Sequence, residues 1–187
     1  MNALLQGQAV EARRSRQSHA FEEFWRGLPK QGLLPHRRDF NPARAAGLLR
    51  HFMLVEVRLD PSATFNIRLV GGAVQERVQR DIKGSDYLQF LPPEYRQGAI
   101  ETARLMFQQP CGVWQITPFH YERGLAENNE ITAFPLLGEG SDLVLGLVLP
   151  RSELVRPISA GDQVLRVDTA TEYEFLDLGA GTPEWRQ

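Results

Sequence analysis

The sequence predicts an α+β fold with one antiparallel sheet of five strands, helices on one face of the sheet, and a helical extension at the N-terminus. Residues 52–59 and 64–70 alternate apolar and polar side chains on either side of the turn Asp60-Pro61-Ser62, which is typical of a half-buried hairpin. More strand-like segments follow the longest helical segment, and the last of them, residues 143–149, is apolar at every position. A strand that is apolar on both faces belongs in the centre of a sheet.

An aromatic stripe predicts the N-terminal helix. Within a polar N-terminal segment, Ser18 is a candidate cap for a helix that ends near Gly27 and Pro29. Its apolar residues recur at the spacing i, i+3, i+4 and i+7 and are Phe21, Phe24, Trp25 and Leu28. We expect this stripe to be buried against the outer face of the sheet or against a second subunit.

Short helical segments are predicted on both sides of the hairpin and before the later strands. They occupy residues 41–49, 73–78, 84–88 and 93–109. Asp39 or Asn41 caps the first of them, which has Pro42 at its first position. Pro93 opens the last and longest, and Pro110 ends it.

The remaining strands are expected at residues 113–121, 130–136 and 143–149. Residues 163–168 and 172–178 are candidates for two further short strands and precede a glycine-containing tail. We therefore divide the chain into three parts. They are a polar N-terminal segment (1–19), a domain that includes the first helix (20–150) and a C-terminal extension (151–187).

The composition excludes several classes of protein. A net charge of −2 over 187 residues argues against a general polyanion binder, so no nucleic-acid partner is expected. Cys111 is the only cysteine, which excludes an intrachain disulfide and a cysteine zinc cluster. No signal peptide and no apolar run near the roughly 20 residues of a membrane span are present, so we expect a cytoplasmic protein without a membrane partner. The common nucleotide-binding and hydrolase motifs are also absent.

An ordered series of short motifs resembles one family. The series comprises Phe24-Trp25, Leu34-Pro35, Arg38-Asp39-Phe40, FMLVEV, FNIRLVGGAVQERVQRDIKG, Tyr87-Leu88 and Leu91-Pro92-Pro93-Glu94. Over roughly residues 20–150 the chain resembles a PAS domain, and it is closer still to a bacterial subfamily of short stand-alone PAS proteins. Asn66, Ile82 and Lys83 depart from the subfamily pattern. The resemblance implies a PAS-like fold and a sensory or interaction module.

The resemblance also implies that any ligand pocket lies between the sheet and the helices. Tyr87, Met106 and Trp114 are candidates for an apolar lining, although such residues are more often ordinary core. His120 and Arg68 are the candidate polar contacts. The alternative for His120 is a position at the surface or on an edge strand. The alternative for Arg68 is an ion pair with Glu56. The two residues lie opposite each other if the hairpin register places Val57 opposite Ile67.

The cofactor is left unknown, and no metal site is predicted. Haem-binding relatives need an axial histidine, and only His51 and His120 lie in the sheet region. Light-sensing flavin relatives carry a cysteine in a helix, whereas Cys111 follows Pro110 at the start of a strand. Neither cofactor is therefore expected.

The leading hypothesis is a single-domain PAS sensor or adaptor that forms a homodimer. It would bind a small molecule or a protein partner and signal in trans, because the chain carries no output domain. The second hypothesis is a ligand-free dimerisation module with a filled core. The third is a small-molecule enzyme on a related fold, with His120 and Glu130 on neighbouring strands as an acid–base pair. A cavity with a few converging polar groups would favour the first hypothesis.

Overall fold

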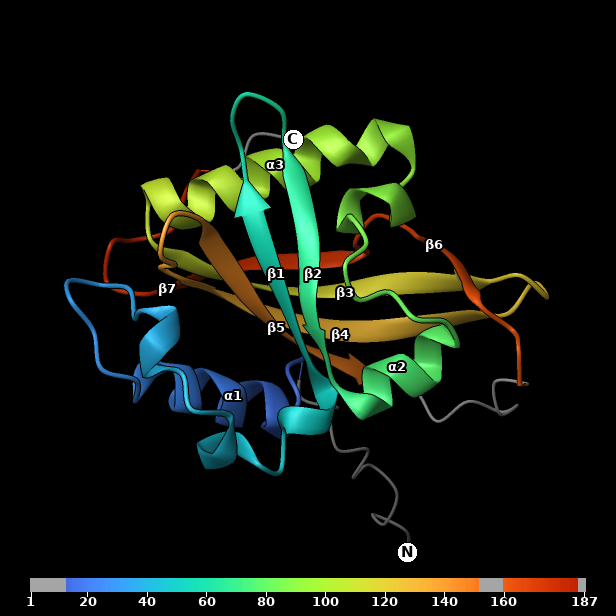
Figure 1. Ribbon diagram of the computed structural model, residues 1–187, viewed down its shortest axis with the longest axis horizontal. Coiled ribbons are helices and arrows are strands. Elements are labelled where there is room, and N and C mark those ends of the chain that lie inside the picture. The colour runs from blue at the N-terminus through green and yellow to red at the C-terminus, as the bar shows by residue number, and fades with distance from the viewer. Residues whose placement is uncertain (1–12, 152–159, 185–187) are drawn as a thin grey trace, which may run out of the picture.

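The computed structural model describes residues 13–151 and 160–184 as one curled sheet with helices on both faces (Figure 1). Residues 1–12 of the predicted polar segment and 152–159 of the predicted C-terminal extension lie outside the described residues. Within residues 13–151 and 160–184, no helix is long and apolar enough to cross a membrane.

The strands are antiparallel and follow the order β2-β1-β5-β4-β3-β6, with β7 also paired to β3. Their bounds are β1 Phe52–Arg58, β2 Thr64–Val70, β3 Cys111–Tyr121, β4 Ala126–Leu136, β5 Asp142–Pro150, β6 Val164–Val167 and β7 Glu172–Asp177. The five predicted strands are confirmed, and β1 and β5 pair in the centre as expected. The C-terminal extension adds β6 and β7 to the edge of β3, so the sheet is larger than the five strands predicted.

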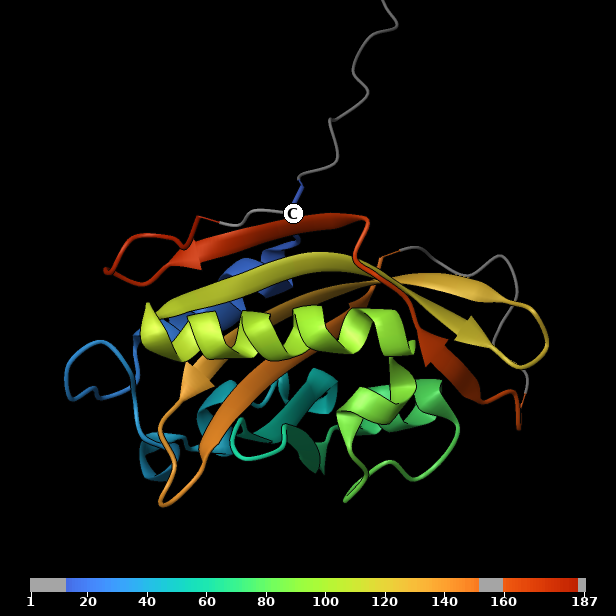
Figure 2. The same ribbon diagram turned by 90° about the horizontal axis from the view of Figure 1, so that it is seen from above.

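Two groups of helices cover opposite faces of this sheet. The inner face carries α2 (Gly72–Val78), η4 (Tyr87–Phe90) and α3 (Pro93–Gln108). The outer face carries α1 (Arg16–Arg26), η1 (Arg37–Asp39) and η2 (Pro42–Ala45), and η3 (Leu49–His51) leads into β1. Figure 2 shows the sheet running between α1 and α3. The apolar residues of β5 contact both layers, which explains why every position from 143 to 149 is apolar.

The aromatic stripe of α1 is buried on the outer face. Phe21, Trp25 and Leu28 are at most 4% exposed, and Phe24 is partly buried. The Trp25 ring stacks on Phe134 with centroids 5.1 Å apart, and its Nε1 donates to the Pro135 carbonyl at 3.1 Å. The stripe therefore packs within its own chain.

The start of α1 differs from the prediction. Ser15, three residues before the expected cap, accepts from the Ser18 amide at 3.1 Å. Ser18 lies inside the helix on its buried side, where its hydroxyl bonds the Thr132 hydroxyl at 2.6 Å. Ser18 lies three residues before Phe21 and shares its face, so it belongs to the buried stripe.

The hairpin register also differs from the prediction. Val57 pairs with Phe65, and Val55 rather than Val57 pairs with Ile67. The register shifts between Leu54 and Val55, which leaves Arg68 as the extra residue of β2. The predicted ion pair nevertheless forms diagonally, because the buried Glu56 carboxylate accepts from Arg68 and also from Arg58.

Segments of the same chain pair with the outer sides of β3 and β2. On the β3 side, β6 and β7 form the edge strands, and the Thr171 amide donates to the Ile116 carbonyl at 2.8 Å. On the β2 side, the Ile67 amide donates to the Ser85 carbonyl at 2.9 Å, and the Gly84 amide donates to the Ile67 carbonyl at 2.8 Å. The segment at residues 84–86 thus follows the outer edge of β2.

Candidate functional site

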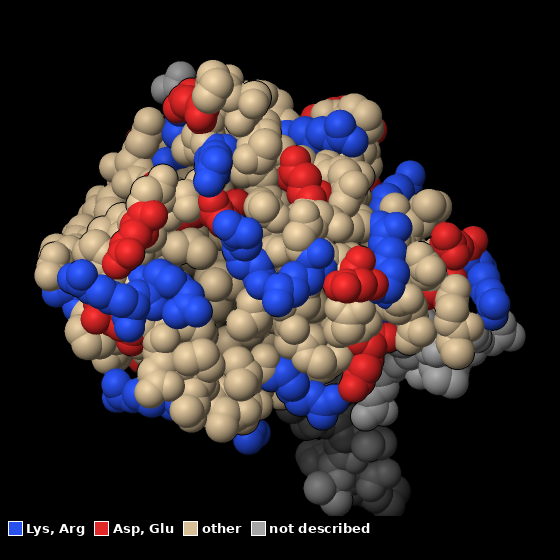
Figure 3. Space-filling model, in the orientation of Figure 1, with Lys and Arg blue, Asp and Glu red and all other residues tan. Residues whose placement is uncertain are grey.

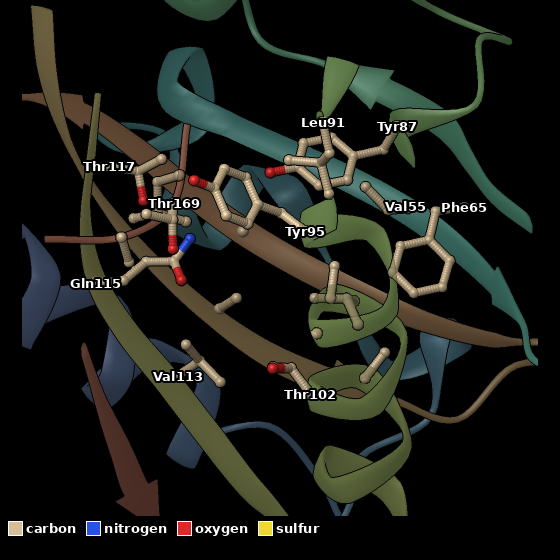
Figure 4. Close-up of a pocket in the computed structure, with 18 of the residues that line it drawn as sticks. Val55, Phe65, Tyr87, Leu91, Tyr95, Thr102, Val113, Gln115, Thr117 and Thr169 are labelled. Carbon is tan, nitrogen blue, oxygen red and sulfur yellow. The ribbon is translucent and has the colours of Figure 1, made fainter. Parts of the chain in front are cut away.

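A cavity of about 350 Å³ lies between α3 and the inner face of the sheet (Figure 4). β1, β3, β4 and β5 form its floor, α3 forms its roof, and η4 and the connection from β6 to β7 border it. Most of the lining is apolar. Its residues include Met53, Val55, Val57, Phe65, Leu91, Ala99, Ala103, Met106, Val113, Ile131, Ala133 and Val144.

The lining follows from the periodicity of each element. Strand residues alternate between faces, so Val113, Gln115 and Thr117 of β3 face the cavity while Trp114 and Ile116 belong to the outer core. Along α3 the lining residues recur at intervals of three or four and form one stripe. They are Glu94, Tyr95, Gly98, Ala99, Thr102, Ala103 and Met106.

Two glycines keep the cavity open. A Cβ added to Gly98 of α3 would have no neighbour within 4 Å, and one added to Gly146 of β5 would meet only carbonyl oxygens at 3.7 and 4.0 Å. Neither glycine has a positive φ, so the backbone does not require glycine at either position. Glycine inside a helix or strand costs about 0.5–1 kcal/mol relative to alanine. Glycine at positions 98 and 146 therefore lowers the stability relative to alanine and leaves space in the cavity.

Several hydroxyl and amide groups lie toward one end of the cavity. In Figure 4 the hydroxyls of Tyr95 and Tyr87 point toward the side where Gln115, Thr117 and Thr169 lie. Thr117 is 1% exposed, and its Oγ1 has no hydrogen-bond partner among the described residues. A buried unpaired hydroxyl costs about 1–3 kcal/mol, which makes this atom a candidate for contact with a ligand.

The polar groups that line the cavity are mostly neutral, and the charged ones are acidic. Burial raises the pKa of Tyr87 to about 12, so its hydroxyl stays protonated at neutral pH and is a hydrogen-bond donor. Among the described lining residues the only formal charges are the carboxylates of Glu94 and Asp168, and no Lys, Arg or His side chain is present. Asp168 already accepts from His120 Nε2 at 3.1 Å and from Arg166 at 3.2 Å. No group of three His, Cys, Asp or Glu side chains within residues 13–151 and 160–184 could hold a metal ion.

The structure brings two of the five predicted site residues to the cavity, Tyr87 and Met106. The assignment of Trp114 to the lining is corrected, because its side chain lies on the outer face, where Nε1 donates to Glu130 Oε1 at 2.7 Å. Apolar residues occupy both parities of this strand, so the pattern alone does not choose the face that Trp114 takes.

The two predicted polar contacts also lie outside the cavity lining. Arg68 is about half exposed and pairs with Glu56 at the β2 bulge. His120 has the strand parity of Trp114 and bonds Asp168. It does not form a pair with Glu130, whose buried carboxylate accepts from Trp114 and from the Ser15 amide at 2.9 Å.

Sequence reasoning missed Tyr95, Gln115 and Thr117. The α3 spacing could have identified Tyr95, because it lies four residues before Ala99 on the stripe that contains Met106. Gln115 and Thr117 are polar residues in a strand, a pattern that normally indicates solvent exposure. Here the same pattern arises from a cavity.

The face of the molecule shown in Figure 3 has no large patch of a single charge that would suggest a second binding site. On this face, Lys and Arg side chains are interspersed with Asp and Glu side chains.

Comparisons with known proteins identify a family. A family model described as a PAS domain matches residues 13–149. Among solved structures, the crystal structure of the PAS domain of an HTR-like protein from Haloarcula marismortui is 14% identical in sequence. The match covers 73% of this chain and 99% of that chain, with a TM-score of 0.41. No curated protein matches.

Proposed function

We propose a function for this chain from its membership of the PAS domain family, which the family match over residues 13–149 shows. The proposed function is that of a sensory or adaptor protein that binds a small molecule in the cavity beneath α3. PAS domains are in general sensory and signalling domains. The observation that carries the proposal for this chain is the cavity itself. It has a mainly apolar lining, a few polar groups and a volume of about 350 Å³, within the usual range for ligand sites.

The output is proposed to act in trans. Ligand binding would change the packing of α3 and η4 on the sheet, and a separate protein would recognise that change. We propose no catalytic role, because the acid–base pair considered from the sequence, His120 and Glu130, does not form.

A homodimer in the cytoplasm remains part of the proposal. The aromatic stripe of α1 gives no support to the dimer, because its burial is accounted for by packing within the chain. Light scattering over a wide concentration range tests the dimer independently of the ligand, and a monomer throughout would contradict it.

The test of the ligand cavity is to fill it. Gly146→Val adds a β-branched side chain to a central strand, where the first added carbon meets only ordinary contacts. We expect native mass spectrometry to find a small molecule bound to the purified wild-type protein and none bound to Gly146→Val, with no decrease in melting temperature. Gly47→Val, the same change at a position with nothing within 4 Å, is the matched control and should retain the ligand.

One result would contradict the ligand cavity. If the wild-type protein neither carries nor takes up any small molecule, and Gly146→Val only changes the melting temperature, the chain is a structural module and the ligand cavity is wrong.

A further inference from the structure

The size of the cavity limits the part of a ligand that it can enclose. At roughly 30 Å³ for each water-sized group, about 350 Å³ accommodates on the order of a dozen non-hydrogen atoms. The aliphatic lining from β1, β5 and α3 favours an apolar body for most of these atoms.

The charges around the cavity limit the ligand further. A carboxylate or phosphate entering the cavity would lose its hydration and would find no basic side chain among the described lining residues. An ammonium group would also lose its hydration. Asp168 is already engaged by His120 and Arg166, and Glu94 is exposed to solvent. An uncharged molecule avoids both penalties.

One polar group on the ligand is nevertheless favoured. The Thr117 hydroxyl is buried without a partner, and Gln115 on the same strand face lines the same part of the cavity. Figure 4 shows Tyr95 and Tyr87 directing their hydroxyls toward this part. A ligand hydroxyl placed here can both accept and donate a hydrogen bond, which would satisfy the Thr117 Oγ1.

We infer that the ligand class is an uncharged amphiphile of about a dozen non-hydrogen atoms, with an apolar chain or ring along α3 and one hydroxyl group bonded to Thr117. This inference rests on the proposed function, because it specifies the occupant of the same cavity.

The experiment compares four probes of similar shape: 1-octanol, octanoate, octylammonium and 1-chlorooctane. Each is titrated into methyl-labelled protein, and binding is followed by NMR at the methyl groups of the lining residues Met106, Val113 and Val144. We expect 1-octanol to bind at least tenfold more tightly than octanoate or octylammonium.

Two isosteric variants test the role of Thr117. Thr117→Val should weaken 1-octanol binding roughly 2- to 10-fold, the value of one net hydrogen bond, and leave 1-chlorooctane binding unchanged. Its melting temperature in the absence of ligand should not fall, because the substitution removes an unpaired buried hydroxyl. Thr132→Val is the matched control: its hydroxyl bonds Ser18 on the outer face, so this variant should lose stability and keep its affinity for 1-octanol.

The outcomes separate the two levels of the proposal. If octanoate or octylammonium binds as tightly as 1-octanol, or if Thr117→Val binds 1-octanol as the wild type does, the ligand class is wrong while the cavity stands. If none of the four probes shifts the lining methyl groups, the ligand cavity of the proposed function is wrong as well.

Discussion

Truncation of Trp25 gives the sharpest test of the outer layer. The Trp25 side chain is 1% exposed and stacks on Phe134, and its indole nitrogen donates to the Pro135 carbonyl at 3.1 Å. Lys30 Nζ lies 4.9 Å from the centre of its ring. Substitution of a buried tryptophan by alanine costs about 3–5 kcal/mol, and the lost hydrogen bond adds about 1 kcal/mol. We therefore expect Trp25→Ala to lower the free energy of unfolding by about 4–6 kcal/mol.

This loss is comparable to the whole stability of a small domain, about 5–15 kcal/mol, so a graded variant is needed. Trp25→Phe keeps an aromatic ring in the site but removes the indole N–H, and it should cost about 1–3 kcal/mol. Urea unfolding monitored by circular dichroism measures both variants against the wild type. If Trp25→Ala changes the free energy of unfolding by less than about 1 kcal/mol, α1 is a solvated appendage and the outer core described above is wrong.

Two further predictions concern titratable groups. Burial raises the pKa of Glu56, but hydrogen bonds from Ser141, Arg68 and Arg58 outweigh it and leave the pKa below its usual value. The stabilisation is therefore present above the unfolded-state pKa of about 4.3 and is lost as the pH falls through the folded-state value. Glu56→Gln should lower the free energy of unfolding by about 1–3 kcal/mol at neutral pH, as measured by urea unfolding. The difference from the wild type should shrink toward zero in acid. A difference that does not depend on pH would contradict the ion pairs. Burial, with a contribution from Asp177, raises the pKa of Cys111 to about 11, and its side chain is fully buried. Cys111 should therefore react with a thiol reagent at pH 8 only when the protein unfolds, and prompt reaction of the folded protein would refute this.

The layers of the fold could be predicted from the sequence because their signals are redundant. The doubly apolar segment at residues 143–149 indicated a central strand, and the aromatic stripe of α1 indicated a buried helix. Neither argument depended on register. The order of strands in the sheet came from the family resemblance.

Where the prediction failed, the pattern permitted two answers. Both parities of β3 contain apolar residues, so the pattern could not show that Trp114 faces α1 and Val113 faces α3. The β2 bulge at Arg68 moved the hairpin register, which no alternation pattern records. The cavity itself is a property of packing: Gly98 and Gly146 define it only because they face the same space from different layers.

The chain's own segments beside β2 and β3 limit how a partner can bind. A peptide that adds a strand to a sheet needs unpaired backbone amides and carbonyls along an edge. Here Ile67 on β2 already exchanges hydrogen bonds with residues 84 and 85, and β3 already pairs with β6 and β7. At these positions β-augmentation would first require an existing segment to leave. A partner of the proposed kind is therefore not expected to add a strand beside β2 or β3. Recognition of side chains on the helical layers does not meet this obstacle, and there a small change in the packing of α3 would alter the surface that the partner contacts.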